Sequence, residues 1–226
     1  LFKRGAKLVL LGCNTATAVA ARRLQQTWLP YAGWAGHNVL GIVAPTVEAA
    51  TQTPWAVTTP QYPQKYITDI LAVFGTTRTV TSGVYPEEIR KRCPRMRVYQ
   101  QVAANLAGAI EDEASEEELD ALVKAAVAGL RIQPHGQAPH RVILGCTHFP
   151  LVEHLFQKHL APSVRILSQP DVVADSLEHY LERHPHFGDC EVAGRLRLLT
   201  TGDADEISKR ARVFWPDVPG FEPTET

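Results

Sequence analysis

Five short apolar runs, separated by helical patterns, constrain the fold of this chain more than any other feature of its sequence. Each run is rich in branched residues and ends in glycine, proline or a polar residue, as is typical of strands covered on both faces of a parallel sheet. Their alternation with helices predicts an α/β architecture with short connections. The runs are AKLVLLG (6–12), NVLGIVAP (38–45), ILAVFG (70–75), RVILG (141–145) and SVRILS (163–168).

The clearest helical pattern covers residues 116–130, where apolar residues recur at positions i, i+3, i+4 and i+7. Ser115 followed by Glu118 is typical of a capping box at its start. We therefore interpret the acidic run EDEASEEELD as a solvated helix N-terminus. Residues 53–66 are rich in proline and lack periodicity, so they predict a loop, and HPHFGD (184–189) predicts a second break.

Composition argues against several classes of function. With a formal net charge of -1, the chain lacks the broad basic surface that nucleic acid or an anionic membrane would require. No apolar run reaches the ~20 residues of a membrane-spanning helix. No signal-peptide pattern is visible. The cysteines form no CxxC pair, and no paired Cys/His ligands occur at the usual short spacings, which predicts neither a disulfide framework nor a zinc site. We therefore expect mostly free thiols in a reducing, cytoplasmic compartment.

Two of the predicted strands end in the same motif, LGCNT (11–15) and LGCTH (144–148). In open α/β sheets, ligands bind where strands end and helices begin. We therefore expect Cys13 and Cys146 beside helix N-termini, which lower the pKa of a thiol and suit a carboxylate ligand. The residues expected to cap these helices are Asn14 or Thr15 in the first loop and Thr147 or His148 in the second, with Pro150 in the first turn.

A pair of thiols indicates different chemistry from a single thiol. One cysteine after a strand is often only buried packing, and we interpret Cys93 and Cys190 in that way. A cysteine hydrolase needs one thiol with a base. Two equivalent thiols instead suit removal of a proton from one face of a carbon atom and delivery to the other face. A thiol pKa of about 8.5 makes both protonation states accessible near neutral pH.

The motifs GCNTATA (12–18) and GCTHFPL (145–151) closely resemble the signatures of glutamate racemases, within the cofactor-independent aspartate/glutamate racemase family. GIVAP (41–45), FGTTRTVTSGVY (74–85) and LLTTGDADEISKRARVFW (198–215) are similar to further family segments, in the expected order. The resemblance implies two flavodoxin-like three-layer α/β domains, related by pseudo-twofold symmetry, with the active site in the cleft between them. The implied first domain is 1–37 plus 168–226, and the second is 38–167.

The resemblance also implies roles for individual residues. Cys13 and Cys146 would be the acid/base residues, and His148 would assist its neighbouring cysteine. The implied substrate-binding residues are Asn14, Thr15, Thr76, Thr79 and Thr147. Other interpretations are that His148 only caps a helix and that Thr76 and Thr79 are turn and capping residues. We interpret Glu111 as a helix-surface acid, and the motifs leave open which cysteine serves which enantiomer.

The implied function is interconversion of L- and D-glutamate without a cofactor or metal, supplying D-glutamate for peptidoglycan in a bacterial cytoplasm. The expected partner is a small-molecule substrate, and we expect no binding to nucleic acid or to a membrane. The sequence does not decide whether the protein forms a homodimer. One alternative is a racemase acting on aspartate or a hydantoin. The other alternative is a non-catalytic ligand-binding protein of this fold. Loss of either thiol would favour this alternative, but both thiols are present.

The start of the chain departs from the family pattern. Family members begin with a strand and a D-S-G-x-G-G loop, followed by a P-Y-G segment, and neither occurs in this sequence. The resemblance places the aspartate of that loop beside the first cysteine. A molecule that truly lacks the segment is expected to be poorly stable and weakly active. A segment missing only from this sequence would leave the enzyme interpretation intact.

Overall fold

The computed structural model describes residues 1–133, 137–188 and 194–225. Its chain divides into two compact units, Leu1–Phe187 and Gly188–Thr226. Cys190, which the sequence predicts to be structural, lies outside the described residues, as does the last residue of the predicted break at 184–189. None of the helices in the described part of the chain is long and apolar enough to cross a membrane.

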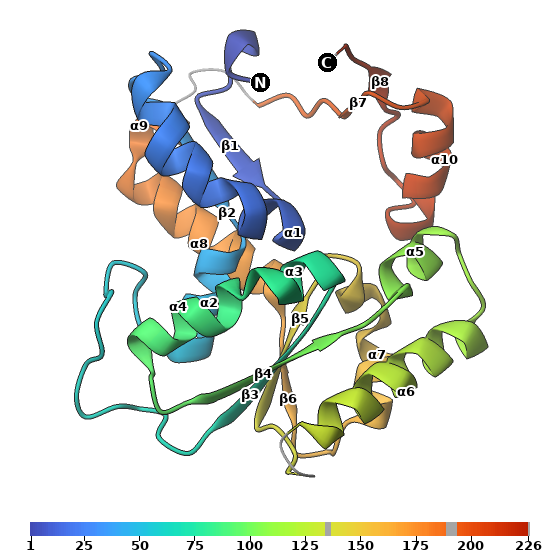
Figure 1. Ribbon diagram of the computed structural model, residues 1–226. Helices are drawn as coiled ribbons and strands as arrows, with labels where there is room; N and C mark the ends of the chain where they lie inside the picture. The colour runs from blue at the N-terminus through green and yellow to red at the C-terminus, as the bar shows by residue number, and fades with distance from the viewer. Residues whose placement is uncertain (134–136, 189–193, 226) are drawn as a thin grey trace. The chain divides into compact units, whose positions relative to one another are not determined.

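The larger sheet of the first unit has four parallel strands in the order β4-β3-β5-β6 (Figure 1). Every residue of β3 is buried, which confirms the prediction of a strand covered on both faces. The parallel arrangement confirms the predicted α/β class. The strands are β3 (Ile70–Gly75), β4 (Arg97–Val102), β5 (Arg141–Gly145) and β6 (Arg165–Leu167).

Helices cover both faces of this sheet because successive strand side chains point to opposite sides. Ala72 and Phe74 of β3 belong to one apolar core, with α5, α6 and α7. Leu71 and Val73 belong to a second core, with α2 and α4. Figure 1 shows these two helix layers on either side of the strands. The helices are α2 (Val43–Thr51), α3 (Thr77–Ser82), α4 (Val84–Arg92), α5 (Leu106–Glu111), α6 (Glu116–Ile132) and α7 (Glu153–His159).

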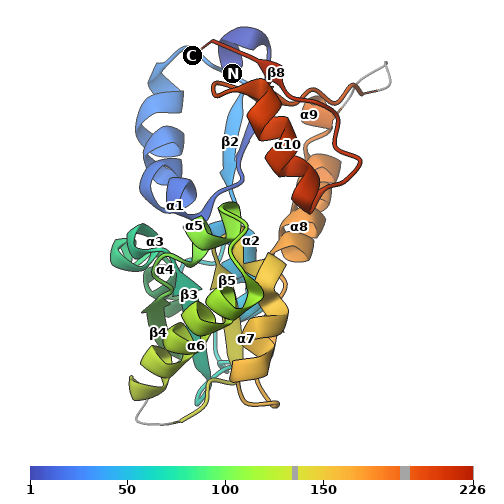
Figure 2. The ribbon, with the colours of Figure 1, turned by 90° about the vertical axis from the view of Figure 1, so that its right-hand side faces the viewer.

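A smaller parallel sheet pairs β1 (Leu8–Leu11) with β2 (Asn38–Gly41). The strand β1 leads to the first cysteine, and it pairs with residues 38–41 of β2. Since the predicted second domain starts at residue 38, this pairing crosses the predicted domain boundary. Between these two strands in sequence, helical segments lie beside β2 (Figure 2). The segments near this sheet are η1 (Phe2–Arg4), α1 (Asn14–Ala16), η2 (Thr17–Ala21), η3 (Leu24–Trp28), η4 (Leu29–Tyr31) and, after β6, α8 (Gln169–Arg183).

The ends of several elements differ from the predictions. The predicted strand 38–45 stops at Gly41, and its last residues begin α2, whose first turn accommodates Pro45. The sequence does not predict β4, since RVYQQV carries polar residues and lies at a sheet edge. The predicted helix 116–130 is confirmed, with Ser115 Oγ accepting from the Glu118 N–H at 3.2 Å. Residues 53–66 contain no helix or strand, as predicted.

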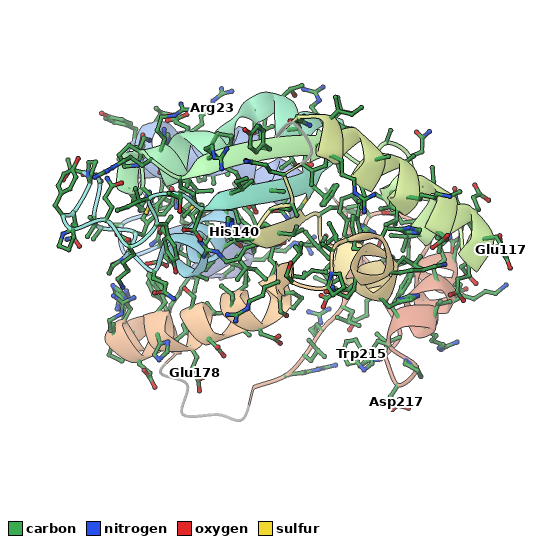
Figure 3. The ribbon with its side chains drawn as sticks, turned by 90° about the horizontal axis from the view of Figure 1, so that it is seen from below. Arg23, Glu117, His140, Glu178, Trp215 and Asp217 are labelled. Carbon is green, nitrogen blue, oxygen red and sulfur yellow. The ribbon has the colours of Figure 1, made fainter. Side chains whose placement is uncertain are left out.

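The amino end of β5 is held by a histidine. His140 Nδ1 accepts a hydrogen bond from the Ile70 N–H at 3.0 Å, and Figure 3 views this end of the sheet. A short helix, α9 (Pro185–Gly188), follows the end of α8. In the second unit, β7 (Leu199–Thr200) pairs in parallel with β8 (Glu222–Pro223), and α10 (Ala204–Phe214) lies between them in sequence.

Candidate active site

The second cysteine loop follows β5 without a gap. Cys146 is 7% exposed, and its carbonyl accepts the Phe149 N–H at the start of η5 (Phe149–Val152). Pro150 lies in the first turn, as predicted. Gly145 must be glycine, because a Cβ there would lie 2.9 Å from the carbonyl oxygen of Phe74 on the neighbouring strand. This close approach fixes the direction in which the loop leaves the sheet.

The environment of Cys146 favours the protonated thiol. Burial raises the pKa of Cys146, and negative charges on Cys13 and Glu111 act in the same direction. The backbone N–H groups of His148 and Phe149 oppose this shift by hydrogen bonding to the sulfur. The prediction that the helix start lowers the thiol pKa is therefore wrong for Cys146, because desolvation outweighs the backbone donors.

A chain of polar contacts links Cys146 to an acid at the end of α5. Cys146 Sγ lies 3.7 Å from His148 Nδ1, and His148 Nε2 lies 2.8 Å from Glu111 Oε1. His148 occupies the N-cap position of η5 but makes no capping side-chain bond, which leaves its ring for these two partners. Glu111 is 54% exposed, as expected for a surface acid, yet it also contacts His148. In the sequence, only its position at the end of AANLAGAIE marks Glu111 as a candidate for the site, and this signal is weak.

The first cysteine loop leaves β1 in a different environment. Cys13 is exposed and has extended backbone angles, φ -139° and ψ 129°. It occupies the N-cap position itself, so the prediction of Asn14 or Thr15 as the cap is wrong. The Cys13 carbonyl accepts the Thr17 N–H at 2.9 Å, which starts the helical segment.

Asn14 lies beneath this loop rather than at its surface. It is 2% exposed, and its Nδ2 donates to Gln169 Oε1 at 2.8 Å. Its Oδ1 accepts from the Tyr85 hydroxyl at 2.6 Å. The sequence predicts neither partner: Tyr85 ends the FGTTRTVTSGVY segment, whereas no motif marks Gln169.

Three threonine hydroxyls join the first loop to α3. Thr15 Oγ1 lies 2.9 Å from Thr76 Oγ1 and 3.1 Å from Thr79 Oγ1, and the latter two lie 3.2 Å apart. Thr76 also caps α3 by accepting the Thr79 N–H. Thr76 therefore has the capping role of the alternative interpretation as well as a place in a polar cluster.

The remaining predicted residue, Thr147, is exposed and lines a pocket of about 200 Å³ together with Gly12 and Gln169. Residues of both cysteine loops thus meet at one pocket, and a charge on Cys13 acts on the titration of Cys146. Within the described ranges, no three His, Cys, Asp or Glu residues are arranged to hold a metal ion. Of the residues that the structure describes, neither cysteine and no histidine lines this pocket. The two loops beside it carry thiols, an imidazole, hydroxyls and backbone N–H groups, which suit proton transfer and the binding of an anionic ligand.

Sequence comparison identifies relatives over almost the whole chain. The model of the Asp/Glu/Hydantoin racemase family matches residues 1–177. A glutamate racemase of Phenylobacterium zucineum (strain HLK1) is 45% identical over 99% of this chain and 80% of its own length. A glutamate racemase of Caulobacter sp. (strain K31) is 42% identical over 98% of this chain and 79% of its own length.

Structural comparison agrees on the fold. The crystal structure of glutamate racemase from Francisella tularensis subsp. tularensis SCHU S4 in complex with D-glutamate has a TM-score of 0.79 and 18% identity, covering 100% of this chain and 76% of that one. Glutamate racemase isoform RacE1 from Bacillus anthracis has a TM-score of 0.73 and 23% identity, covering 97% of this chain and 73% of that one. The α/β fold described above is therefore shared with both proteins.

Proposed function

Because the chain belongs to the Asp/Glu/Hydantoin racemase family, we propose that it interconverts L- and D-glutamate. The relatives that are 45% and 42% identical are both glutamate racemases, which supports glutamate over other substrates of the family. The product D-glutamate would serve peptidoglycan synthesis in a bacterial cytoplasm. Each of two α/β domains would supply one cysteine to the site.

The proposed reaction uses Cys13 and Cys146 as paired acid and base. One thiolate removes the Cα proton of glutamate, so that an S–H bond forms while the C–H electron pair stays on carbon. The other thiol then gives its proton to the opposite face of that carbon. Each turnover inverts the centre and exchanges the protonation states of the two sulfurs, which the reverse reaction restores.

His148 and Glu111 would assist Cys146. Burial disfavours the Cys146 thiolate, so a base in this position needs compensation. The His148 ring at 3.7 Å can share the thiol proton, and Glu111 at 2.8 Å from its far nitrogen stabilises the imidazolium that results. This relay is the observation that carries the proposal, because a buried thiol with only a structural role needs no such partner.

Substrate binding would use Thr15, Thr76, Thr79 and Thr147, whereas Asn14 is only 2% exposed and is bonded to Gln169 and Tyr85. The hydroxyls of Thr15, Thr76 and Thr79 lie within 3.2 Å of one another, so an arriving carboxylate can replace bonds among them. Preorganised donors of this kind stabilise the negative charge that develops as the Cα proton leaves. Thr147 is exposed and lines the pocket beside the two loops, so its side chain could add a further contact.

Incubation with L-glutamate in heavy water tests the function. We expect deuterium at Cα together with D-glutamate, and loss of turnover by at least about 100-fold in Cys13→Ser and Cys146→Ser. Cys93→Ser is the matched control, since Cys93 is 4% exposed and lies in the core between α2 and α4. Faster exchange with L-aspartate than with L-glutamate would assign the other substrate, and racemisation by either site variant at the wild-type rate would refute the two-thiol mechanism.

A further inference from the structure

A cluster of buried polar side chains lies under the two cysteine loops. We call it the amide hub; it consists of Asn14, Thr46, Tyr85 and Gln169. Its members come from α1, α2, α4 and the first residue of α8, and they are 2%, 1%, 0% and 3% exposed. Since buried polar groups are costly unless they are hydrogen-bonded, a cluster of this size needs mutual partners.

Gln169 is the centre of the hub. Its Oε1 accepts from Asn14 Nδ2 at 2.8 Å, and its Nε2 lies 3.1 Å from Asn14 Oδ1. The same Nε2 lies 2.8 Å from Thr46 Oγ1 and 3.1 Å from the Tyr85 hydroxyl. Only a primary amide offers both an acceptor and two donors at this point. The two N–H groups of Nε2 are shared among the three oxygens of Asn14, Thr46 and Tyr85.

The hub touches both cysteine loops. Asn14 directly follows Cys13. The ring of Tyr85 packs against Gly145, where a Cβ would lie 3.4 Å from Tyr85 Cε2, and Gly145 directly precedes Cys146. The Tyr85 hydroxyl donates to Asn14 Oδ1, so a single side chain spans from one loop to the other. Burial raises the pKa of Tyr85 well above its usual value, which keeps this hydroxyl a donor.

The two thiols depend on the hub to different extents. Cys146 is held by its own burial and by His148. Cys13 is exposed, and in the part of the chain that the structure describes its Sγ makes no hydrogen bond. Its position therefore depends on the backbone on either side of it, where Asn14 is the first anchored residue.

We propose that Gln169 is a positioning residue for the two-thiol reaction: by fixing the Asn14 amide, it holds the Cys13 loop at a set distance from the Cys146 loop. This inference rests on the proposed function, because it concerns the geometry of the same two thiols. Gln169 touches no reacting atom in this scheme. It acts through Asn14, whose amide it contacts at both the oxygen and the nitrogen.

Kinetics of Gln169→Leu and Thr46→Val test the proposal. Leucine keeps much of the volume but removes every hub bond of Gln169, whereas Thr46→Val removes one hub bond and leaves the Asn14 contacts intact. We expect Gln169→Leu to lower kcat and kcat/KM together by about tenfold or more, as for an interaction needed in the transition state. Thr46→Val should keep kcat within about twofold.

Gln169→Glu adds a pH-dependent arm. When protonated, the carboxyl group introduced by this substitution would keep one donor and one acceptor, whereas its ionised form can only accept. Burial raises the pKa of a carboxyl group at such a site. The activity of Gln169→Glu relative to the wild type should therefore rise as the pH falls. Relative activity that is flat with pH contradicts the proposed need for a donor at this position.

Hydrogen exchange gives a readout that does not require turnover. Gln169→Leu should accelerate exchange of the Thr17 amide, which bonds to the Cys13 carbonyl, and Thr46→Val should not. If the wild-type protein fails to racemise glutamate, the proposed function is wrong. Hydrogen exchange of the Thr17 amide would still decide whether Gln169 holds the Cys13 loop. The inference is overturned if Gln169→Leu keeps wild-type kcat or wild-type Thr17 exchange, or if both variants lose activity equally at equal loss of stability.

Discussion

The two cysteines follow the same Gly-Cys pattern but lie in opposite environments. Cys146 is 7% exposed and has a raised pKa, whereas Cys13 is exposed and reaches its place through its backbone neighbours. In the proposed two-base reaction, one sulfur starts each turnover as a thiol and the other as a thiolate. Burial of Cys146 favours its thiol form.

At the same scale, Glu111→Gln tests the relay to Cys146. In the proposed mechanism, His148 would lose its carboxylate partner at 2.8 Å, so transfer of the Cys146 proton would become harder. We expect kcat to fall by about tenfold, equivalent to ~1.4 kcal/mol in the barrier. Asp112→Asn, one residue away, is the control and should keep wild-type turnover. Steady-state rates measured in both directions check this, and an unchanged Glu111→Gln rate would remove Glu111 from the mechanism.

Gly41→Ala is a residue-scale prediction on stability. A Cβ at Gly41 would clash with the side chain of Thr17. Thr17 cannot move away freely, because its buried hydroxyl donates to the Leu11 carbonyl at 3.1 Å and accepts the Ile42 N–H at 3.3 Å. We expect a loss of about 1–3 kcal/mol in the free energy of unfolding, measured by urea denaturation. Gly108→Ala, where a Cβ meets no atom within 4 Å, should cause no loss.

At the scale of elements, three helices in the described part of the chain start with an N-cap side chain that accepts a backbone N–H. Thr76 caps α3, Ser115 caps α6 and Asp203 caps α10, each accepting an N–H three residues ahead. Each cap determines the residue at which its helix begins. The loop before that helix runs from the end of the preceding strand to the cap. The position of Thr76 thus follows from β3 and α3 together, which places it at the carboxyl edge of the sheet.

Ser115→Ala measures the cap of α6. The acidic residues that follow, Glu116 to Glu118, favour the helix start but cannot replace the Ser115 hydroxyl bond to the Glu118 N–H. We expect a loss of about 1 kcal/mol in unfolding free energy, seen as a lower thermal midpoint with unchanged racemase turnover. Ser115→Asp should restore most of the stability, and failure to do so would indicate that the hydroxyl is not acting as a cap.

At the scale of the whole first unit, an ion-pair network joins the helical segment after Cys13 to α4. Glu88 is 3% exposed and pairs with Arg22, Lys91 and Arg92. Burial acts to raise the pKa of Glu88, but hydrogen bonds from Lys91 and Arg92 and the nearby positive charges outweigh it and lower the pKa. The network therefore contributes stability only while the carboxyl is ionised.

The sign of the pH dependence follows from that lowered pKa. Stability from Glu88 is fully present above the unfolded carboxyl pKa of 4.5 and is lost as the pH falls through the lower folded-state pKa. Glu88→Gln should cost about 3 kcal/mol at neutral pH, because it leaves the buried Arg92 charge without its carboxylate partner. The stability of this variant should also fall less on acidification. Glu87→Gln, at a side chain 54% exposed, should cost under about 1 kcal/mol. Urea denaturation at several pH values checks this, and equal losses in both variants would contradict it.

The sequence by itself determined the α/β class, three strands of the larger sheet and the two cysteine loops. These depend on local properties: branched apolar runs, helical periodicity, caps and proline in a first turn. The prediction of β3 and β5 agrees with the structure to the residue. The family resemblance can also be recognised from the sequence alone, because each of its motifs is a contiguous segment of the chain.

Only the tertiary structure decided the state of Cys146, the contact between Glu111 and His148, and the amide hub around Gln169. A thiol pKa depends on how much water the fold excludes, and in Cys146 that desolvation outweighs the helix start that the sequence indicates. The polar edge strand β4 is defined by its pairing with β3. Contacts such as Asn14 with Gln169 join segments distant in the chain, and no local pattern specifies them because packing of the intervening elements brings them together.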